Sequence, residues 1–326
     1  MKNIHTISNL AVAVTFFYRE HRLAFLDLIS ASFKNLADRV HVYIVTNTNI
    51  DEGKNAICSV LQEKGFSFDI HTPKLLGHPY LLPLCHVELF QELLSKEQSV
   101  SHFLYLEDDL LITDGNIEYW LQARQDLQVY GLIPSFLRYE RKDDGELYAV
   151  DVWERTCFET APKIFINNGY CYMNMPYPYQ GMYLLDRELM AEYMSYWSSN
   201  PYFSRWGLRE TGAQGVTYVN VPPGFKTRNL VGFDTDAFAV DPRCLIHHVS
   251  NTYVAVADPR NRSAKIPVRN LVFRKKFVKQ AMCLNGLIYR LFLLLLLFFR
   301  WDTIVQYVNS PRDYIIERLN RFKRAS

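Results

Sequence analysis

The chain has 326 residues, of which 49% are hydrophobic, enough to bury a substantial core and to exclude a largely disordered protein. Its formal charge of +2 conceals an uneven distribution, because residues 271–326 contain 11 Lys and Arg against 3 Asp and Glu. The first 270 residues therefore form an acidic body. The basic residues of the tail lie beside an apolar stretch rather than along a polar face, which argues against a nucleic-acid partner.

Strand-like and helix-like segments alternate over the first hundred residues. The segments NLAVAVTFFY, RVHVYIVTN, FSFDIH and SHFLYLEDD are typical of strands, and the segments between them place apolar residues at helical spacing. This βαβαβαβ order predicts an α/β fold with a mostly parallel central sheet flanked by helices. Ligands of such sheets bind at the carboxyl ends of the strands.

The second half of the body continues the mixture of strands and helices. GNIEYWLQARQDLQ predicts a helix, YGLIPSFLRYE and ELYAVDVW predict strands, and GMYLLDRELMAEYMSYW predicts a strand that turns into a helix. Residues 157–178 are rich in Asn, Tyr and Pro, which favours a loop region that contacts substrate. We expect one domain over residues 1–270 and a helical tail over residues 271–326.

The tail contains nine unbroken apolar residues, Leu291 to Phe299, flanked by Arg290 and Arg300. This run is shorter than the roughly 20 residues of a spanning helix, and with its basic flanks it predicts amphipathic helices on an anionic membrane surface. A buried core or oligomer helix and a short re-entrant insertion are the alternatives. The six cysteines form no CxxC pair, which favours buried reduced thiols in a cytosolic protein over disulfides. With the tail on a membrane surface, the predicted location is peripheral, at the cytoplasmic face.

Three consecutive carboxylates, Glu107, Asp108 and Asp109, follow the apolar strand FLYL. Carboxylates at positions i and i+2 of a strand end point the same way, so Glu107 and Asp109 can share a ligand while Asp108 faces the other side. Hard oxygen ligands suit Mg²⁺ or Mn²⁺, which commonly take their remaining ligands from water and a diphosphate. The alternative is a solvated strand end followed by a helix that Thr113 or Asp114 caps.

Three segments resemble one enzyme family. LYLEDDLLITDGNIEYW resembles the metal-binding segment of the N-acetylglucosaminyltransferase I family, inverting enzymes of the GT-A fold. YPYQGMYLLDRELMAEY is similar to the segment of that family beside the acceptor site, and VAVTFFYREHRL is similar to its nucleotide-contacting turn. The resemblance covers roughly residues 8–230 and implies a GT-A fold and a nucleoside-diphosphate-sugar donor, with UDP favoured.

The resemblance also implies roles for single residues. Asp109 would be the direct metal ligand, with Glu107 as a further contributor to the metal site. Glu107 and Asp108 would hold metal-bound water or hydroxyls of the ribose or sugar. Arg19 would contact the nucleotide or its phosphates, and a surface salt bridge is the alternative for this residue.

The segments for the acceptor and for the catalytic base match the family less well. Gln180 and Gly181 would lie beside the acceptor. The family has paired aspartates before a tryptophan, whereas YFSRWGLRETGAQG has Ser and Arg there, so Glu210 is the nearest carboxylate. An inverting transfer needs a base for the acceptor hydroxyl, and Glu210 is the candidate, with Asp151 and Glu154 as weaker ones. A first-turn helix residue favoured by the helix dipole is the alternative for Glu210.

Two further basic segments are candidates. His247 and His248 follow an apolar strand, and many GT-A enzymes complete the metal shell with a late histidine. Because neighbours on a strand alternate faces, only one of the pair should point inward. Lys226 and Arg228 in GFKTRN would hold diphosphate oxygens, or would be solvated.

The sequence thus predicts a metal-dependent glycosyltransferase that uses Mn²⁺ or Mg²⁺ and a nucleotide-sugar donor. Its acceptor would be a hydroxyl of a lipid-linked or cell-surface glycan, as in lipopolysaccharide or capsule synthesis, because the basic tail suits a membrane surface. A retaining GT-A enzyme and a metal-free glycan-binding or scaffold protein of the same fold are the alternatives. A nuclease or phosphatase would need more carboxylates across several motifs.

Overall fold

The computed structural model describes residues 6–74, 79–152, 161–166, 169–175, 179–196, 208–237, 239–255 and 264–271. Glu154 and the tail beyond Leu271 lie outside these residues, so the predicted tail helices and the domain boundary stay predictions. No helix among the described residues combines the length and the apolar character needed to cross a membrane.

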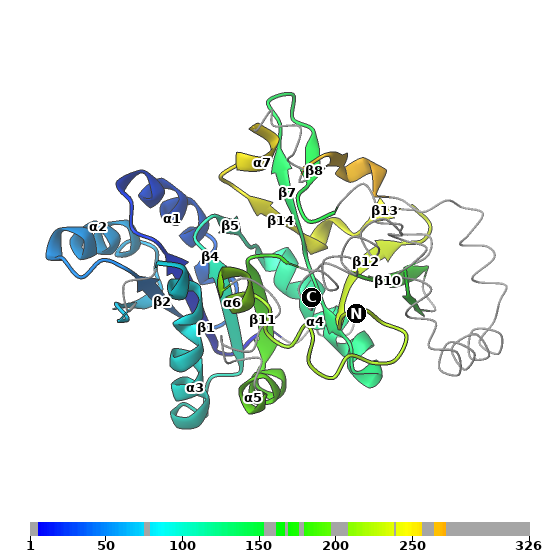
Figure 1. The fold of residues 1–326 in the computed structure, drawn as a ribbon, viewed down its shortest axis with the longest axis horizontal. Helices are drawn as coiled ribbons and strands as arrows, with labels where there is room; N and C mark the ends of the chain where they lie inside the picture. Colours follow the sequence, from blue (N-terminus) through cyan, green and yellow to red (C-terminus); the bar gives the residue numbers. More distant parts are fainter. Residues whose placement is uncertain are drawn as a thin grey trace, which may run out of the picture.

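The described chain is an α/β structure with three mixed sheets (Figure 1). The strands are β1 Leu10–Phe16, β2 Val40–Thr46, β3 Ser67–His71, β4 His102–Glu107, β5 Leu110–Leu111, β6 Ile133–Pro134, β7 Leu137–Arg141, β8 Leu147–Ala149, β9 Lys163–Ile166, β10 Tyr170–Asn174, β11 Met182–Asp186, β12 Asn229–Asp234, β13 Ala239–Val240, β14 Leu245–His248 and β15 Ile266–Pro267. The α-helices are α1 Leu23–Ser30, α2 Asp51–Leu61, α3 His86–Lys96, α4 Asp114–Leu127, α5 Arg187–Ser195, α6 Leu208–Gly212 and α7 Thr252–Ala255.

The first sheet has the order β11-β4-β1-β2-β3. Its first four strands in the chain are parallel, as the alternation of strands and helices predicts, and β11 joins the β4 edge antiparallel. Every residue of the central strand β1 is buried, whereas β3, at the edge opposite β11, alternates between exposed and half-buried residues. In Figure 1, α1 and α2 lie on one side of this sheet and α3 and α5 on the other.

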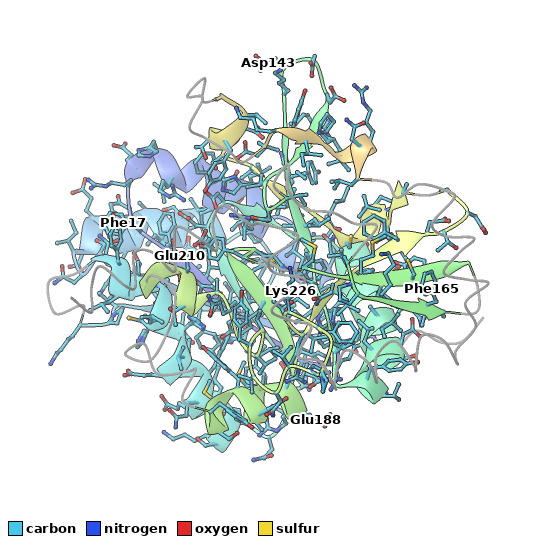
Figure 2. The ribbon with its side chains drawn as sticks, turned by 45° about the vertical axis from the view of Figure 1, so that its right-hand side comes forward. Phe17, Asp143, Phe165, Glu188, Glu210 and Lys226 are labelled. Carbon is cyan, nitrogen blue, oxygen red and sulfur yellow. The ribbon has the colours of Figure 1, made fainter. Side chains whose placement is uncertain are left out.

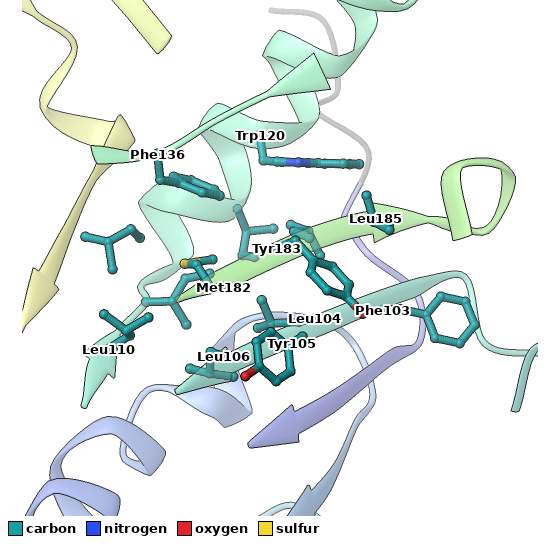
Figure 3. Packing of buried hydrophobic residues seen from close by; sticks show 14 of the residues in the cluster. Phe103, Leu104, Tyr105, Leu106, Leu110, Trp120, Phe136, Met182, Tyr183 and Leu185 are labelled. Atoms are coloured by element: carbon teal, nitrogen blue, oxygen red, sulfur yellow. The ribbon is translucent and has the colours of Figure 1, made fainter. Parts of the chain in front are cut away.

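The core of this sheet is built where β4 and β11 meet. Tyr105 and Tyr183 lie with ring centroids 5.4 Å apart, and both are buried. Figure 3 shows these rings beside the two strands, with Trp120 and Phe136 farther away, next to α4, and His86 of α3 stacks on Tyr105 with ring centroids 3.9 Å apart. This packing holds the carboxyl end of β4, and therefore the acidic triplet, against the turn that precedes β11.

Two smaller sheets complete the described structure. One has the order β13-β12-β10-β9, with β6 beside β12, and the other has the order β15-β8-β7-β14-β5. The first strand of this second sheet along the chain is β5, which begins directly after the triplet, and the sheet extends toward the top of Figure 1. The segment that follows β4 therefore connects the parallel sheet to a second sheet that contains β7 and β14.

Helix α4 begins where the sequence indicates. Thr113 is its N-cap, and Asn116 Oδ1 accepts a hydrogen bond from the Thr113 backbone N–H at 2.8 Å. The Asn116 amide group donates in turn to the backbone carbonyls of Arg243 and Leu245 at 2.7 and 3.0 Å. The helix that follows the triplet is thereby fixed to the start of β14.

Candidate functional site at the acidic triplet

The acidic triplet spans the end of a strand and the following turn. β4 ends at Glu107, and Asp108 and Asp109 form a turn before β5 begins at Leu110. The prediction that Glu107 and Asp109 share one face while Asp108 faces the other is therefore wrong. Alternation of faces requires an extended backbone, and here the backbone turns after Glu107.

Arg22 binds the two aspartates. Its Nε donates to Asp108 Oδ2 at 2.7 Å, its second terminal nitrogen donates to Asp108 Oδ1, and the same nitrogen lies 3.3 Å from Asp109 Oδ2. Arg22 ends the short 3-10 helix Glu20–Arg22 that follows β1, the parallel neighbour of β4. Burial raises the pKa of Asp108 to about 7, against the opposing effect of the Arg22 contacts.

His248 reaches the site through strand pairing. β14 runs antiparallel to β5 with His248 opposite Leu110, and the Val249 backbone N–H donates to the Asp109 carbonyl at 2.9 Å. This register leaves His248 Nε2 3.4 Å from Asp109 Oδ2. His247 points elsewhere and stacks on Tyr139 with ring centroids 4.9 Å apart. The prediction that only one of the two histidines faces the triplet is confirmed.

Glu140 holds the other nitrogen of His248. It lies in β7, beside β14, and its Oε1 is 2.6 Å from His248 Nδ1. Burial lowers the pKa of His248, but hydrogen bonds to Asp109 and Glu140 and the charge of Asp109 outweigh burial and raise it to about 9. Burial likewise would raise the pKa of Asp109, but His248, Arg22 and Arg138 lower it to about 2.

Glu107 faces a different set of partners. Tyr179 donates its hydroxyl to Glu107 Oε1 at 2.7 Å, and the Glu107 backbone N–H donates to the Gly181 carbonyl at 2.9 Å. Gly181 has φ +65°, and a Cβ atom there would lie 2.8 Å from Glu107 Oε2. The turn before β11 is thus packed directly on the first carboxylate, which brings the two segments of the family resemblance together.

A second arginine lies buried behind the site. Arg138, in β7, makes an ion pair with Asp151 in which its terminal nitrogen is 2.6 Å from Asp151 Oδ1. Its guanidinium also lies over the Tyr179 ring, 5.1 Å from the centroid. Asp151, a weaker candidate for the base, is therefore committed to this pair, and the pair supports the tyrosine that holds Glu107.

Several residues that we predicted from sequence lie apart from the triplet. Arg19 is exposed beside the Phe17 ring, and Arg22, three residues later, is the arginine that contacts the aspartates. Arg228 is buried, where it donates to the Gly131 carbonyl and pairs with Glu192 at 2.8 Å. Arg228 therefore ties α5 to the segment before β6, and we leave it out of the site.

The remaining candidates come from the segments around β10, β11 and α6. The Gln180 side chain is buried, accepts from the Phe136 backbone at 3.2 Å and donates to Ser135 Oγ. Burial lowers the pKa of Lys226, whose backbone N–H donates to Asn174. Glu210 lies in the first turn of α6 (Figure 2), and no hydrogen bond or ion pair joins its side chain to the triplet within the described residues.

Asp109 and His248 together offer donor atoms that fit a divalent cation. Asp109 Oδ1 is buried and has no hydrogen-bond partner among the described residues, and the imidazole of His248 lies beside the other oxygen. Two neighbouring ligands of a six-coordinate Mg²⁺ at about 2.1 Å lie about 3 Å apart, so this pair fits. No group of three or more His, Cys, Asp and Glu side chains in the described ranges is arranged to hold a metal. An ion here would take its other ligands from water and substrate.

The charges of the site support the same conclusion. Five carboxylates lie near two guanidiniums and one imidazole, joined by hydrogen bonds, ion pairs and the stacking of Arg138 on Tyr179, so negative charge is in excess by two when every group is ionised. The members are Glu107, Asp108, Asp109, Glu140, Asp151, Arg22, Arg138 and His248. A divalent cation would offset this excess.

Comparison with known proteins adds no assignment. A scan against models of protein families found no match to the chain, and a search of curated proteins found none either.

Sequence reasoning missed Arg22, Glu140, Arg138 and Tyr179. One signal was available for two of them, because Arg138 and Glu140 stand at positions i and i+2 of a strand, directly after the apolar residues Phe136 and Leu137. Two charges on one face of a buried strand need partners, and they mark a polar network. Arg22 had no such signal, since only the turn after β1 selects it over Arg19.

Proposed function

We propose that the protein is a metal-dependent glycosyltransferase that moves a sugar from a nucleoside-diphosphate-sugar to a hydroxyl of a glycan. The observation that carries the proposal is Asp109, a buried carboxylate with one unpartnered oxygen at the carboxyl end of β4. His248 lies against its other oxygen, and Arg22 lies on the same edge. An anionic, metal-assisted donor site needs these three kinds of group.

The residues would divide the donor between them. Asp109 and His248 would hold Mn²⁺ or Mg²⁺, which when bound would neutralise the diphosphate leaving group. Arg22 is half-buried and holds the aspartates with its Nε and one terminal nitrogen, so it can offer its other terminal nitrogen to phosphate oxygens. Glu107, held by the Tyr179 hydroxyl, would bind hydroxyls of the ribose or sugar. We favour UDP as the nucleotide.

The acceptor would approach over the turn before β11. Gly181 lies on Glu107, so an acceptor that contacts this turn would reach the donor sugar. Glu210 at the start of α6 is the proposed base for an inverting transfer, and its replacement by Gln should lower kcat while leaving UDP binding unchanged. The anomeric configuration of the product separates this mechanism from a retaining one.

The decisive experiment is titration calorimetry of UDP and GDP with and without Mn²⁺, on the wild type and on Asp109→Asn. We expect one nucleotide to bind with a strong dependence on Mn²⁺, and we expect the substitution to remove that dependence. His247→Gln is the matched control, because this neighbour of His248 stacks on Tyr139 and faces away from Asp109. Nucleotide binding that is equal with and without metal would refute the proposal.

A second candidate function has an observation in its favour. Arg22 and His248 already provide Asp108 and Asp109 with cationic partners, which suits a metal-free glycan-binding or scaffold protein that retains an enzyme-like site. This candidate requires the folded protein to bind glycans without binding Mn²⁺ and without turning over any donor. The same titrations, followed by a glycan array, separate the two.

The basic tail supports a membrane-associated acceptor, although residues 272–326 lie outside the described part of the chain. We propose peripheral binding at the cytoplasmic face, with a lipid-linked glycan as acceptor. Replacing Lys275, Lys276 and Lys279 by Glu in the full chain should release it from vesicles that contain anionic lipid. Undiminished co-sedimentation of the triple variant, at physiological salt, would contradict this role.

A further inference from the structure

Glu140 is a buried carboxylate that does not touch the triplet. It lies in β7 with no exposed surface, and its oxygens accept three hydrogen bonds. The donors are His248 Nδ1 at 2.6 Å, the Tyr253 backbone N–H at 3.1 Å and the Val254 backbone N–H at 2.6 Å. A carboxylate buried this completely is costly unless it is fully paired, so its place in the strand calls for an explanation.

The hydrogen bond from Glu140 determines which nitrogen of His248 is left for other partners. A carboxylate only accepts, so the proton of this contact lies on Nδ1. Nε2 is then the atom that faces Asp109 Oδ2, at 3.4 Å, with Ser250 Oγ 3.2 Å away. Histidines that bind metals commonly donate their second ring N–H to a carboxylate in this way, which fixes both tautomer and ring orientation.

The contacts of Glu140 with the backbone add a second constraint. Tyr253 and Val254 belong to α7, which begins four residues after the end of β14. By accepting from both backbone groups, Glu140 holds the segment that follows His248 to β7. One side chain therefore fixes the ring of His248 and the backbone beyond it.

We propose that Glu140 is a positioning residue for the metal site, which holds the Nε2 atom of His248 in place to bind a divalent cation together with Asp109. This inference rests on the proposed function, because it assumes that Asp109 and His248 bind the ion. Glu140 itself does not touch the ion or the substrate. Its role differs from that of a structural ion pair, which would stabilise the fold and leave the ligand properties of His248 unchanged.

The test uses the full-length protein, with Mn²⁺ as the probe and electron paramagnetic resonance as the readout. Mn²⁺ is titrated into the protein, and the signal of the free ion gives the affinity. The coupling of bound Mn²⁺ to ¹⁴N reports whether a histidine is a ligand. We expect Glu140→Gln to weaken Mn²⁺ binding by about 10-fold to 100-fold and to reduce the ¹⁴N coupling. Ser250→Ala is the matched control, since Ser250 Oγ also approaches the ring of His248 without being a carboxylate. It should change neither quantity by more than about twofold.

A measurement on the wild type keeps the proposal testable if Glu140→Gln fails to fold. In protein labelled with ¹⁵N-histidine and loaded with diamagnetic Mg²⁺, we expect the signal of His248, assigned by its loss in His248→Gln, to show a proton on Nδ1 and none on Nε2. A proton on Nε2 with bare Nδ1 would overturn the proposal.

The outcomes separate this inference from the function on which it rests. If Asp109→Asn weakens Mn²⁺ binding but Glu140→Gln binds Mn²⁺ like the wild type with undiminished ¹⁴N coupling, the role of Glu140 is refuted and the proposed function stands. If Asp109→Asn leaves Mn²⁺ affinity unchanged, the metal site and the role of Glu140 both fail.

Discussion

The protonated ring of His248 should stabilise the metal-free protein in a defined pH range. Its pKa is raised from 6.5 to about 9, and its side chain is 6% exposed. A raised pKa means that the stabilisation is fully present below about pH 6.5 and is lost as the pH rises through 9. The difference of about 2.5 pKa units corresponds to about 3 kcal/mol. His248→Gln removes the titrating group, so it should cost about 3 kcal/mol more at pH 6 than at pH 10.

The assay is urea unfolding followed by tryptophan fluorescence, in EDTA, for the wild type and His248→Gln from pH 6 to pH 10. Trp120 is buried in the core and reports loss of tertiary structure. His247→Gln is the control, because burial lowers the pKa of His247 and the stability linked to it changes below pH 6.5 instead. Free energies of unfolding of wild type and His248→Gln that stay parallel across this range would refute the ion-pair reasoning.

Three further predictions concern the groups around Glu107. Gly181→Ala should lower the free energy of unfolding, measured by thermal unfolding, by about 1–3 kcal/mol and should reduce Mn²⁺-dependent UDP binding. The alanine would have to adopt a positive φ, and its Cβ would clash with Glu107 Oε2. Unchanged UDP binding would argue against a role for this turn. Tyr179→Phe should weaken UDP-sugar binding more than UDP binding in calorimetry, since it frees Glu107 while leaving Asp109 in place; equal losses for both ligands would contradict this. Arg138→Met should destabilise the fold by about 3–5 kcal/mol in urea because it leaves Asp151 buried and unpaired, and a double variant with Asp151→Leu should recover most of the loss.

Hydrophobic patterning was sufficient to predict the four parallel strands of the first sheet. β1 and β4 are apolar on both faces, which is typical of strands buried between helices, and the alternation of elements over the first hundred residues requires parallel pairing. The pairing of β11 was not predictable in this way. Its segment was recognised as a strand followed by a helix, but an antiparallel edge partner 75 residues after β4 depends on tertiary packing that local periodicity does not encode.

At the site, the local sequence predicted the position of the acidic triplet but not the distant residues that contact it. The sequence placed the acidic triplet at the carboxyl end of a strand, and the strand does end at Glu107. It did not show where the backbone turns, so the faces of Asp108 and Asp109 were assigned wrongly. Arg22 is 86 residues from Asp108 along the chain and Glu140 is 108 residues from His248. The turn after β1 positions Arg22, and the pairing of β7 with β14 positions Glu140.

The register of β14 also explains why a single substitution in β7 should alter the surroundings of Asp109. β14 pairs with β5 on one side and with β7 on the other, so His248 stands between Asp109, which adjoins β5, and Glu140, which is in β7. A shift of one residue in either pairing would exchange the faces of His247 and His248 and would place the ring that now stacks on Tyr139 against the triplet. The donor site that we propose is therefore a property of two sheets joined at the turn after β4. Substitutions that slip β14 should abolish metal binding even when every carboxylate remains.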